Sequence, residues 1–238
     1  MPTPLPTKIP TPTPISTSIV TPTARVSATP KPTATPLPGT INLNVPFTSQ
    51  APEQNWDEFH EEACEEAAIL TAQWYAFGKV GKNEAGYANR IPVAEAEKSL
   101  VDIVAWEKNI VSDWKDTTAE ETIRIAKELL GMHNVTLFDG GTTDDFKKEL
   151  AKGNIIVLPT AGRLLNNPNF KSPGPPYHMI VLRGYNANGF ITNDPGTRKG
   201  EGYVYSEATI NNAWHDWTGS IDTIQSGVKK AIVVGREP

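Results

Sequence analysis

The sequence predicts an α+β fold in which a helical first half packs on an antiparallel sheet. Three observations lead to this class. Apolar residues recur at helical spacing between residues 62 and 152, short apolar runs separated by turn residues follow from residue 154 onwards, and no internal repeat or second linker divides the chain. Helices followed by antiparallel strands are typical of α+β domains. One folded domain is therefore expected.

The first 39 residues differ in composition from the rest of the chain. They contain 11 of the 21 prolines, ten threonines, three basic residues and no acidic residue. Proline fixes φ and removes a backbone donor, so residues 1–39 should form an extended, polyproline-II-like linker. This linker could be a semi-rigid stalk that holds the domain off a surface, or a disordered tail. Residues 40–238 would then form the folded domain.

Helices are predicted mainly in the first half of the domain, over residues 62–77, 92–110, 117–130 and 142–152. Gly78 stands where the first helix should end, because glycine readily adopts the left-handed conformation that closes a helix. Thr117 or Thr118 caps the third helix, with a glutamate three residues later that completes a capping box. Residues 40–47 alternate apolar and polar side chains, which predicts a strand with one buried face, and Pro46 places it at an edge or an end.

Strands are predicted mainly in the second half. Short apolar runs indicate them over residues 135–138, 154–159, 178–185, 190–193, 202–205 and 230–234. A turn at residues 186–189 joins two of these strands in a hairpin. Ser206 should cap a short helix that reaches Trp214. The second half therefore supplies most of the sheet.

Charge excludes some classes of partner. The linker contributes +3 to a formal net charge of −5 at pH 7, so the domain carries −8. Neutralisation of phosphates supplies most of the affinity for nucleic acids, so an acidic domain without a stripe of Lys and Arg is not expected to bind them. No run of about 18 apolar residues is present to span a membrane. We expect the protein to be a monomer.

The location of the protein is predicted from the linker and the cysteine count. The only cysteine, Cys64, cannot form an internal disulfide bond, so stability does not depend on an oxidising compartment. Met1 is followed directly by Pro-Thr repeats and not by the basic and apolar regions of a signal peptide. A Thr/Pro-rich spacer ahead of a globular domain is nevertheless common after an anchor or a signal. We therefore expect an extracytoplasmic or cell-surface location.

The chemistry centres on Cys64, at the predicted start of a helix. Thiolate is the nucleophilic form of cysteine, and a helix N-terminus favours it. Such a nucleophile needs a base and a group that orients the base. His178 begins an apolar strand, and Asp194 follows the next strand, so the hairpin turn would bring the two side chains together. His60, four residues before the cysteine, is a rival base.

Carboxylates surround the cysteine in sequence, at Glu61, Glu62, Glu65 and Glu66. A carboxylate beside a thiol raises the pKa of the thiol, which opposes the effect of the helix N-terminus. If these side chains point to solvent, salt screens their effect on Cys64. The thiolate would then depend on an ion pair with protonated His178, and we expect such a pair.

Several motifs recur in a fixed order: Val-Pro-Phe-Thr-Ser-Gln (45–50), Asn-Trp (55–56), Ala-Cys-Glu-Glu-Ala (63–67), Tyr-His-Met-Ile-Val-Leu-Arg-Gly-Tyr (177–185), Asn-Asp-Pro-Gly (193–196) and Ala-Trp (213–214). Over about residues 41–235 this order resembles the C39-like cysteine peptidases of papain-like fold. The resemblance implies Cys64 as nucleophile, His178 as base, Asp194 as orienting residue and Gln50 as oxyanion-hole side chain. Gln50 lies 14 residues before the cysteine, a wider gap than in papain itself.

The substrate of the best-known relatives is not expected for this protein. Those enzymes cleave double-glycine leader peptides within export transporters, and this sequence contains no transporter segment. The sequence therefore predicts a cysteine peptidase that hydrolyses peptide or isopeptide bonds in a peptide or protein substrate. Two alternatives remain open: a transpeptidase or amide-forming acyltransferase that uses the same acyl-enzyme, and a catalytically silent surface-binding module.

Each candidate residue also has an ordinary interpretation. A lone cysteine is usually a small buried apolar residue, Asp194 could be a turn former, and Gln50 could be an ordinary loop residue. His133, at a helix end, is expected to be a cap or an exposed residue, and His215 is expected to be structural. One cysteine and four scattered histidines give no zinc-type ligand spacing, and no Gly-rich phosphate motif is present. We therefore predict no metal and no cofactor.

Overall fold

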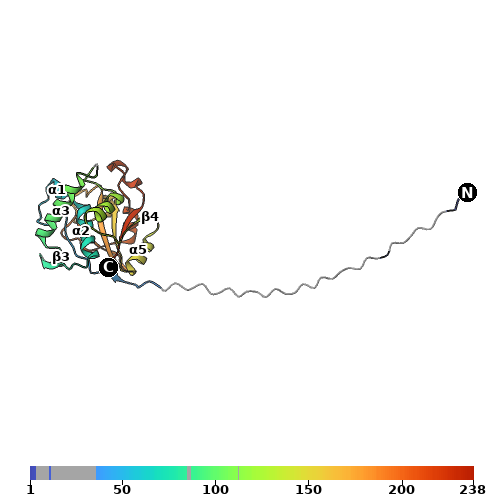
Figure 1. The fold of residues 1–238 in the computed structure, drawn as a ribbon, viewed down its shortest axis with the longest axis horizontal. Coiled ribbons are helices and arrows are strands. Elements are labelled where there is room, and N and C mark those ends of the chain that lie inside the picture. The colour runs from blue at the N-terminus through green and yellow to red at the C-terminus, as the bar shows by residue number, and fades with distance from the viewer. Residues whose placement is uncertain (4–10, 12–35, 85–86, 112) are drawn as a thin grey trace. The chain divides into compact units, whose positions relative to one another are not determined.

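The computed structural model describes residues 1–3, 11, 36–84, 87–111 and 113–238, and Figure 1 shows their ribbon. The linker predicted over residues 1–39 lies mostly outside these described residues. Residues 36–238 cluster into one compact unit, and every element named below belongs to it. Within the described ranges, no helix combines the length and the apolar character needed to cross a membrane.

An antiparallel sheet forms the centre of the described fold. Its strands are β1 (Ile41–Asn42), β4 (Val135–Asp139), β5 (Ile155–Thr160), β6 (His178–Asn186), β7 (Gly189–Asn193), β8 (Glu201–Tyr205) and β9 (Lys230–Val234). The order across the sheet is β4-β9-β5-β6-β7-β8, and β1 pairs with the far end of β6 beyond the end of β5. The predicted hairpin at residues 186–189 is confirmed, because Asn186 pairs with Gly189 and Val181 with Asn193.

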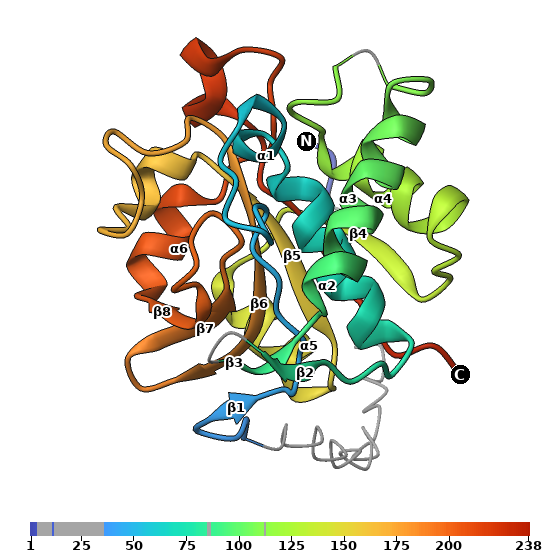
Figure 2. The same ribbon diagram turned by 90° about the vertical axis from the view of Figure 1, so that its left-hand side faces the viewer.

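Helices cover both faces of this sheet. They are α1 (Glu58–Glu61), α2 (Cys64–Ala76), α3 (Val93–Glu107), α4 (Ala119–Arg124), α5 (Thr143–Ala151) and α6 (Glu207–Ala213). Figure 2 shows α2, α3 and α4 side by side on one side of the sheet. The helices α5 and α6 belong to a second core on the opposite face. The predicted α+β class is confirmed, with helices on two faces.

Both faces of strand β5 are buried, and this accounts for its apolar sequence. Ile155 and Val157 pack into the core beneath α2 and α3, whereas Ile156 and Leu158 pack into the core with α5 and α6. Because both faces of the strand are buried, it is a continuous apolar run and not an alternating one. The two cores exclude water from the middle of the sheet, and this rigid platform carries the loops at the end where β6 begins.

Predicted caps agree with the structure. Thr118 and Glu121 form the capping box at the start of α4, and a π-helical turn (Ile125–Leu129) continues that helix. Gly78 follows α2 with a φ of 67°, the left-handed conformation that favours glycine. Pro92 precedes α3 and Ser206 caps α6. These ends were predictable because they depend on local backbone chemistry.

The strand predicted over residues 40–47 is largely wrong, since β1 ends at Asn42. Pro46 has no N–H to donate, and the N–H of Phe47 donates to the carbonyl of Asn89 at 2.8 Å. This segment therefore leaves the main sheet and runs beside the separate hairpin of β2 (Lys82–Glu84) and β3 (Tyr87–Arg90), which the sequence did not predict.

Candidate active site

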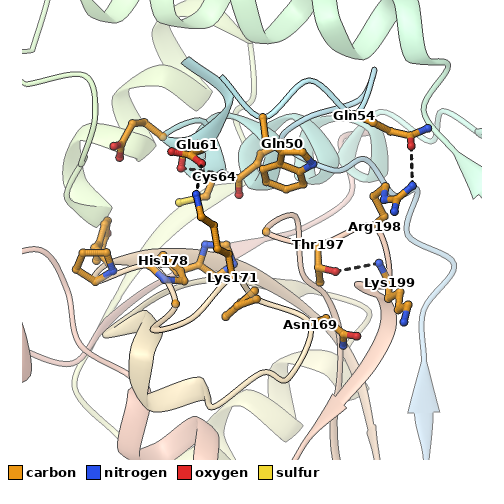
Figure 3. Close-up of a pocket in the computed structure, with 18 of the residues that line it drawn as sticks. Gln50, Gln54, Glu61, Cys64, Asn169, Lys171, His178, Thr197, Arg198 and Lys199 are labelled. Carbon is orange, nitrogen blue, oxygen red and sulfur yellow. Dashed lines mark hydrogen bonds and ion pairs between the residues drawn. The ribbon is translucent and has the colours of Figure 1, made fainter. Parts of the chain in front are cut away.

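A cleft of about 1380 Å³ lies where the N-terminus of α2 meets the beginning of β6. One wall comes from the chain between Gln50 and Cys64, and the other comes from the loops around residues 168–178 and 196–199. Figure 3 shows Cys64 and His178 on opposite walls, with Gln50 close to the cysteine. The cleft is larger than the roughly 300–1,000 Å³ that is usual for sites of drug-sized ligands.

His178 and Asp194 form a buried pair on one wall. The Nε2 atom of His178 lies 2.8 Å from Oδ1 of Asp194, and the two side chains are 1% and 0% exposed. The proximity predicted from the hairpin is therefore confirmed. The other ring nitrogen, Nδ1 of His178, is buried and has no hydrogen-bond partner among the described residues. That nitrogen is the atom left to exchange a proton with a nucleophile.

Three further donors hold Asp194. Its Oδ2 accepts hydrogen bonds from the Tyr205 hydroxyl at 2.5 Å and from Nδ2 of Asn167 at 3.1 Å, and its Oδ1 accepts one from the Gly196 N–H at 3.0 Å. Burial raises the pKa of Asp194, but the neighbouring His178 and these donors lower it more, so the net shift is downward. The carboxylate is thus kept ionised.

Tyr205 and Asn167 were missed by sequence reasoning. Tyr205 ends β8 and Asn167 lies in the loop that precedes β6, so each reaches Asp194 only through the tertiary fold. A tyrosine at a strand end and an asparagine in a loop are both ordinary at such positions, and no local pattern marks them.

The imidazole ring is also fixed by close packing. A Cβ atom on Gly196 would lie 2.7 Å from Cε1 of His178, and one on Gly162 would lie 2.8 Å from its Cβ. Phe170 meets the ring edge to face, with 5.3 Å between the ring centroids. The glycine of the Asn-Asp-Pro-Gly motif therefore does more than allow a turn, because it leaves the space that the histidine ring occupies.

Cys64 is the first residue of α2 and is 5% exposed. Its thiol donates a hydrogen bond to Oε2 of Glu65 at 2.8 Å. Burial raises the pKa of Cys64 well above its usual value and Glu65 raises it further, while the Met179 N–H lowers it. The ion pair expected between Cys64 and His178 is not formed in this arrangement, because Nδ1 of His178 has no hydrogen-bond partner and the sulfur contacts Glu65 instead.

The condition that the carboxylates around Cys64 point to solvent is not met by two of them. Glu65 and Glu66 are 1% and 0% exposed, since the first turns of α2 pack against α3 and the sheet. Glu66 faces the buried Glu107 of α3, and no donor elsewhere in the described chain reaches either carboxyl group. A hydrogen bond between these two forms only when one of them holds a proton. Burial raises the pKa of both, that of Glu107 to about 8.

Gln50 lies on the cleft wall with its amide already engaged. Its Nε2 donates to the carbonyls of His60 at 2.7 Å and of Glu61 at 3.0 Å, which uses both amide protons. Its backbone N–H donates to the carbonyl of Pro195 at 3.0 Å, so Gln50 ties the cysteine wall to the turn after Asp194. The predicted oxyanion role therefore requires that one carbonyl bond be exchanged for a bond to substrate.

The other histidines have different partners. The Nδ1 of His60 lies 2.8 Å from Asp57 and its Nε2 lies 2.9 Å from Glu97, so two carboxylates engage both ring nitrogens of this rival base. The backbone N–H of His133 donates to Oε1 of Glu237 at an exposed position. His215 bonds the carbonyl of Gly227. Among the described residues, no group of three or more His, Cys, Asp or Glu side chains is arranged to hold a metal ion.

Two polar contacts span the cleft between its walls. Nζ of Lys171 lies 3.6 Å from Oε1 of Glu61, and Nη1 of Arg198 donates to Oε1 of Gln54 at 2.6 Å (Figure 3). Both contacts, an ion pair and a hydrogen bond, involve exposed side chains, and exposed contacts of this kind contribute little to stability. They can therefore open without a large cost when a substrate enters.

Comparison with known proteins identifies the family and the fold of the chain. The sequence profile of the Peptidase_C39 like family matches residues 42–221. The chain belongs to this family. Among solved structures, the chain is similar to the crystal structure of a Bacillus anthracis protein described as a C39-like peptidase, with 14% identity and a TM-score of 0.51 over 83% of this chain and 98% of that one. A search of curated proteins finds no match.

Membership of the Peptidase_C39 like family supports a peptidase kind of activity, and the similar structure supports a papain-like α+β fold. The matched region contains the four candidate residues Gln50, Cys64, His178 and Asp194. The structure brings the first three to one cleft and joins the fourth to His178. Their individual roles are a matter of chemistry and are proposed below.

Proposed function

We propose that the domain is a cysteine peptidase that hydrolyses peptide or isopeptide bonds, with Cys64 as nucleophile, His178 as base and Asp194 as the residue that orients the base. The observation that carries this proposal is the buried His178–Asp194 pair, which leaves Nδ1 of the histidine as the free ring nitrogen in the cleft that Cys64 lines. The family supports peptidase activity in general.

The chemistry follows from these positions. The thiol proton passes to Nδ1 of His178 while the sulfur forms a bond to the carbonyl carbon of the substrate. Asp194 stabilises the resulting imidazolium. His178 then donates this proton to the leaving amine as the carbon–nitrogen bond breaks, and the acyl group remains on Cys64. Water, deprotonated by His178, releases the acyl group and restores the thiol.

The developing oxyanion needs donors. The N–H of Cys64 belongs to the first turn of α2, where the helix itself supplies no acceptor. Gln50 would supply the second donor by giving up its longer bond, the one to the Glu61 carbonyl at 3.0 Å. We propose that the substrate carbonyl oxygen replaces the Glu61 carbonyl as the acceptor of this Gln50 proton when the cleft is occupied.

Hydrolysis is tested with a library of synthetic peptides, including lysine-linked branched peptides, analysed by mass spectrometry. We expect cleavage by the wild-type protein and none by Cys64→Ala or His178→Ala. The same reaction with an added amine measures acyl transfer, since an amide product in place of the acid would favour the transpeptidase alternative. A wild-type protein that cleaves no peptide and accepts no acyl-type probe would contradict the proposal in favour of a binding module.

A further inference from the structure

We propose that Trp56 is a specificity-determining residue whose indole ring binds an apolar side chain of the peptide substrate, beside the catalytic pair. The proposal rests on the function above, because a peptide is the substrate that this function implies. It goes beyond that function by naming the kind of side chain that the cleft selects.

Trp56 differs from the other tryptophans of the chain. It is 38% exposed, and within the described ranges no hydrogen bond, aromatic ring or cation engages its side chain. The other five pack into one of the two cores or stack on an aromatic ring: Trp74, Trp106, Trp114, Trp214 and Trp217. An indole is a large apolar surface with one polar N–H, so it stabilises a complex most when another group covers it.

The position of Trp56 indicates what would cover it. Trp56 lines the same cleft as Cys64 and His178. Among the exposed large apolar residues of the described chain, only Trp56 and Ile221 line this cleft. Single exposed apolar residues elsewhere on a surface are ordinary, but this one lies in the concave site that contains the catalytic groups. A bound peptide is therefore the group that would cover the ring.

The loop that carries Trp56 is fixed on both sides of the ring. Before it, the N–H of Gln54 donates to the carbonyl of Ala51 at 2.9 Å, and Gln54 has a φ of 67°, which is uncommon for a residue other than glycine. After it, Asp57 caps α1 and accepts the N–H of His60 at 3.0 Å. A loop that is already ordered loses little conformational entropy when a ligand binds to it.

The same loop faces the opposite wall of the cleft. Nη1 of Arg198 donates to Oε1 of Gln54 at 2.6 Å, so residues 51–57 and 196–199 meet across the cleft (Figure 3). In the second segment, Gly196 has no side chain and Thr197 is buried. Trp56 is the largest apolar side chain of the two segments. A peptide bound between them would therefore place an apolar side chain best against the indole.

The test compares peptides that differ at one position. In a peptide that the wild-type protein cleaves, Leu, Phe and Gly replace each residue in turn on both sides of the scissile bond, and kcat/KM is measured. At one position we expect kcat/KM to be at least about tenfold higher with Leu or Phe than with Gly. In Trp56→Ala this preference should fall to within about twofold, through a higher KM for the apolar peptides with kcat unchanged. Trp56→Phe, which keeps an apolar ring, should retain most of it.

The matched control is Val80→Ala, which removes an exposed apolar side chain that does not line the cleft. This variant should keep the wild-type preference. A preference that survives in Trp56→Ala would overturn the proposal. An equal loss of kcat/KM for the Gly, Leu and Phe peptides would also overturn it, because that result would show that Trp56 supports the loop and does not select the substrate.

Binding to Cys64→Ala tests the same contact without turnover. Apolar peptides of the hydrolysis library, titrated into this variant, should change its tryptophan emission, and Trp56→Phe in the same background should abolish the change while peptide still binds by calorimetry. An emission change that persists in the double variant would overturn the proposal. This conservative variant also decides the question if Trp56→Ala does not fold. A failure of peptide hydrolysis would leave the binding result interpretable, so the two proposals can fail separately.

Discussion

The two walls of the cleft differ in how completely their polar groups are satisfied. On the His178 wall, Asp194 accepts four hydrogen bonds, and two glycines and an aromatic ring confine the imidazole. On the Cys64 wall, the thiol contacts Glu65, and the next residue, Glu66, meets Glu107 of α3 in a buried pair of carboxyl groups whose oxygens have no hydrogen-bond partner among the described residues.

This difference indicates that the base is preorganised and the nucleophile is not. The His178 wall matches what an orienting carboxylate must do before substrate arrives. On the Cys64 wall, the sulfur contacts Glu65 and not His178, and the Gln50 amide is bonded to carbonyls of its own chain. We infer that substrate binding rearranges the cysteine wall and leaves the histidine wall unchanged. The predictions below test each wall in turn.

The largest effect is expected from Asp194→Asn. An amide in place of the carboxylate no longer stabilises the imidazolium and can select the wrong tautomer, so kcat for peptide hydrolysis should fall by about 10³- to 10⁴-fold with KM little changed. Steady-state kinetics on a cleaved peptide measure this. Asp222→Asn, at an exposed position, is the control. A loss confined to KM would show that Asp194 acts on binding and not on the base.

A smaller effect is expected from Gly196→Ala, which tests the packing of the histidine ring. The new methyl group would lie 2.7 Å from Cε1 and 2.9 Å from Nε2 of His178, so the ring must shift away from Asp194. We expect kcat to fall by roughly 10- to 100-fold. Gly39→Ala is the control, because a Cβ there meets no atom within 4 Å. Full activity in Gly196→Ala would mean that the ring position is not critical.

Tyr205→Phe removes one donor to Asp194 and keeps the packing. A hydrogen bond to a charged group contributes about 1.5–3 kcal/mol, so we expect a measurable loss of stability in urea and a decrease in kcat of about tenfold. Tyr203→Phe is the matched control, since Tyr203 packs against the Tyr205 ring with centroids 4.8 Å apart. Equal effects of the two substitutions would argue against a specific role for the Tyr205 hydroxyl.

The smallest effect on activity is expected from Glu107→Gln. This substitution tests the buried Glu66–Glu107 pair next to the cysteine wall, by its effect on the free energy of unfolding. The pKa of Glu107 is raised by burial from 4.5 to about 8. A carboxyl with a higher pKa in the folded protein binds its proton more tightly there, so stability is lost as pH rises from about 4.5 to about 8. We expect wild-type unfolding free energy to fall by on the order of 3 kcal/mol over this range.

In Glu107→Gln this pH dependence should become smaller, because one carboxyl group with a raised pKa is removed and the amide can donate to Glu66 without ionising. Urea unfolding at pH 5 and pH 9 measures the difference. Glu95→Gln, an exposed position on the same helix, should retain the wild-type dependence. Retention of the full dependence in Glu107→Gln would show that another group causes it.

Part of this site was predictable from the sequence, because it depends on interactions between residues that are close in the sequence. The hairpin between β6 and β7 depends on apolar runs and a turn, and it places Asp194 beside His178. The position of Cys64 at a helix start follows from the spacing of apolar residues and from Gly78 at the other end. Caps and turns follow from backbone chemistry within a few residues.

The rest depends on contacts between distant segments. Glu65 and Glu66 occupy a polar stretch of sequence, and their burial follows only from the packing of α2 between α3 and the sheet. Tyr205 and Asn167 reach Asp194 across the fold without a sequence signal. The departure of residues 44–47 from the sheet depends on Asn89, more than forty residues away. The spacing of apolar residues predicts which face of a helix or strand is buried, but it does not predict which distant segment packs against that face.

The central claim is that Cys64 is a nucleophile only through His178. It is tested most directly by the rate of acylation of Cys64 by a substrate-like acyl probe, measured by intact-protein mass spectrometry beside iodoacetamide alkylation. We predict one added acyl group in the wild-type protein, none in Cys64→Ala, and at least about 100-fold slower acylation in His178→Ala, in which iodoacetamide still labels Cys64. Acylation of Cys64→Ala, or acylation of His178→Ala at the wild-type rate, would contradict the account.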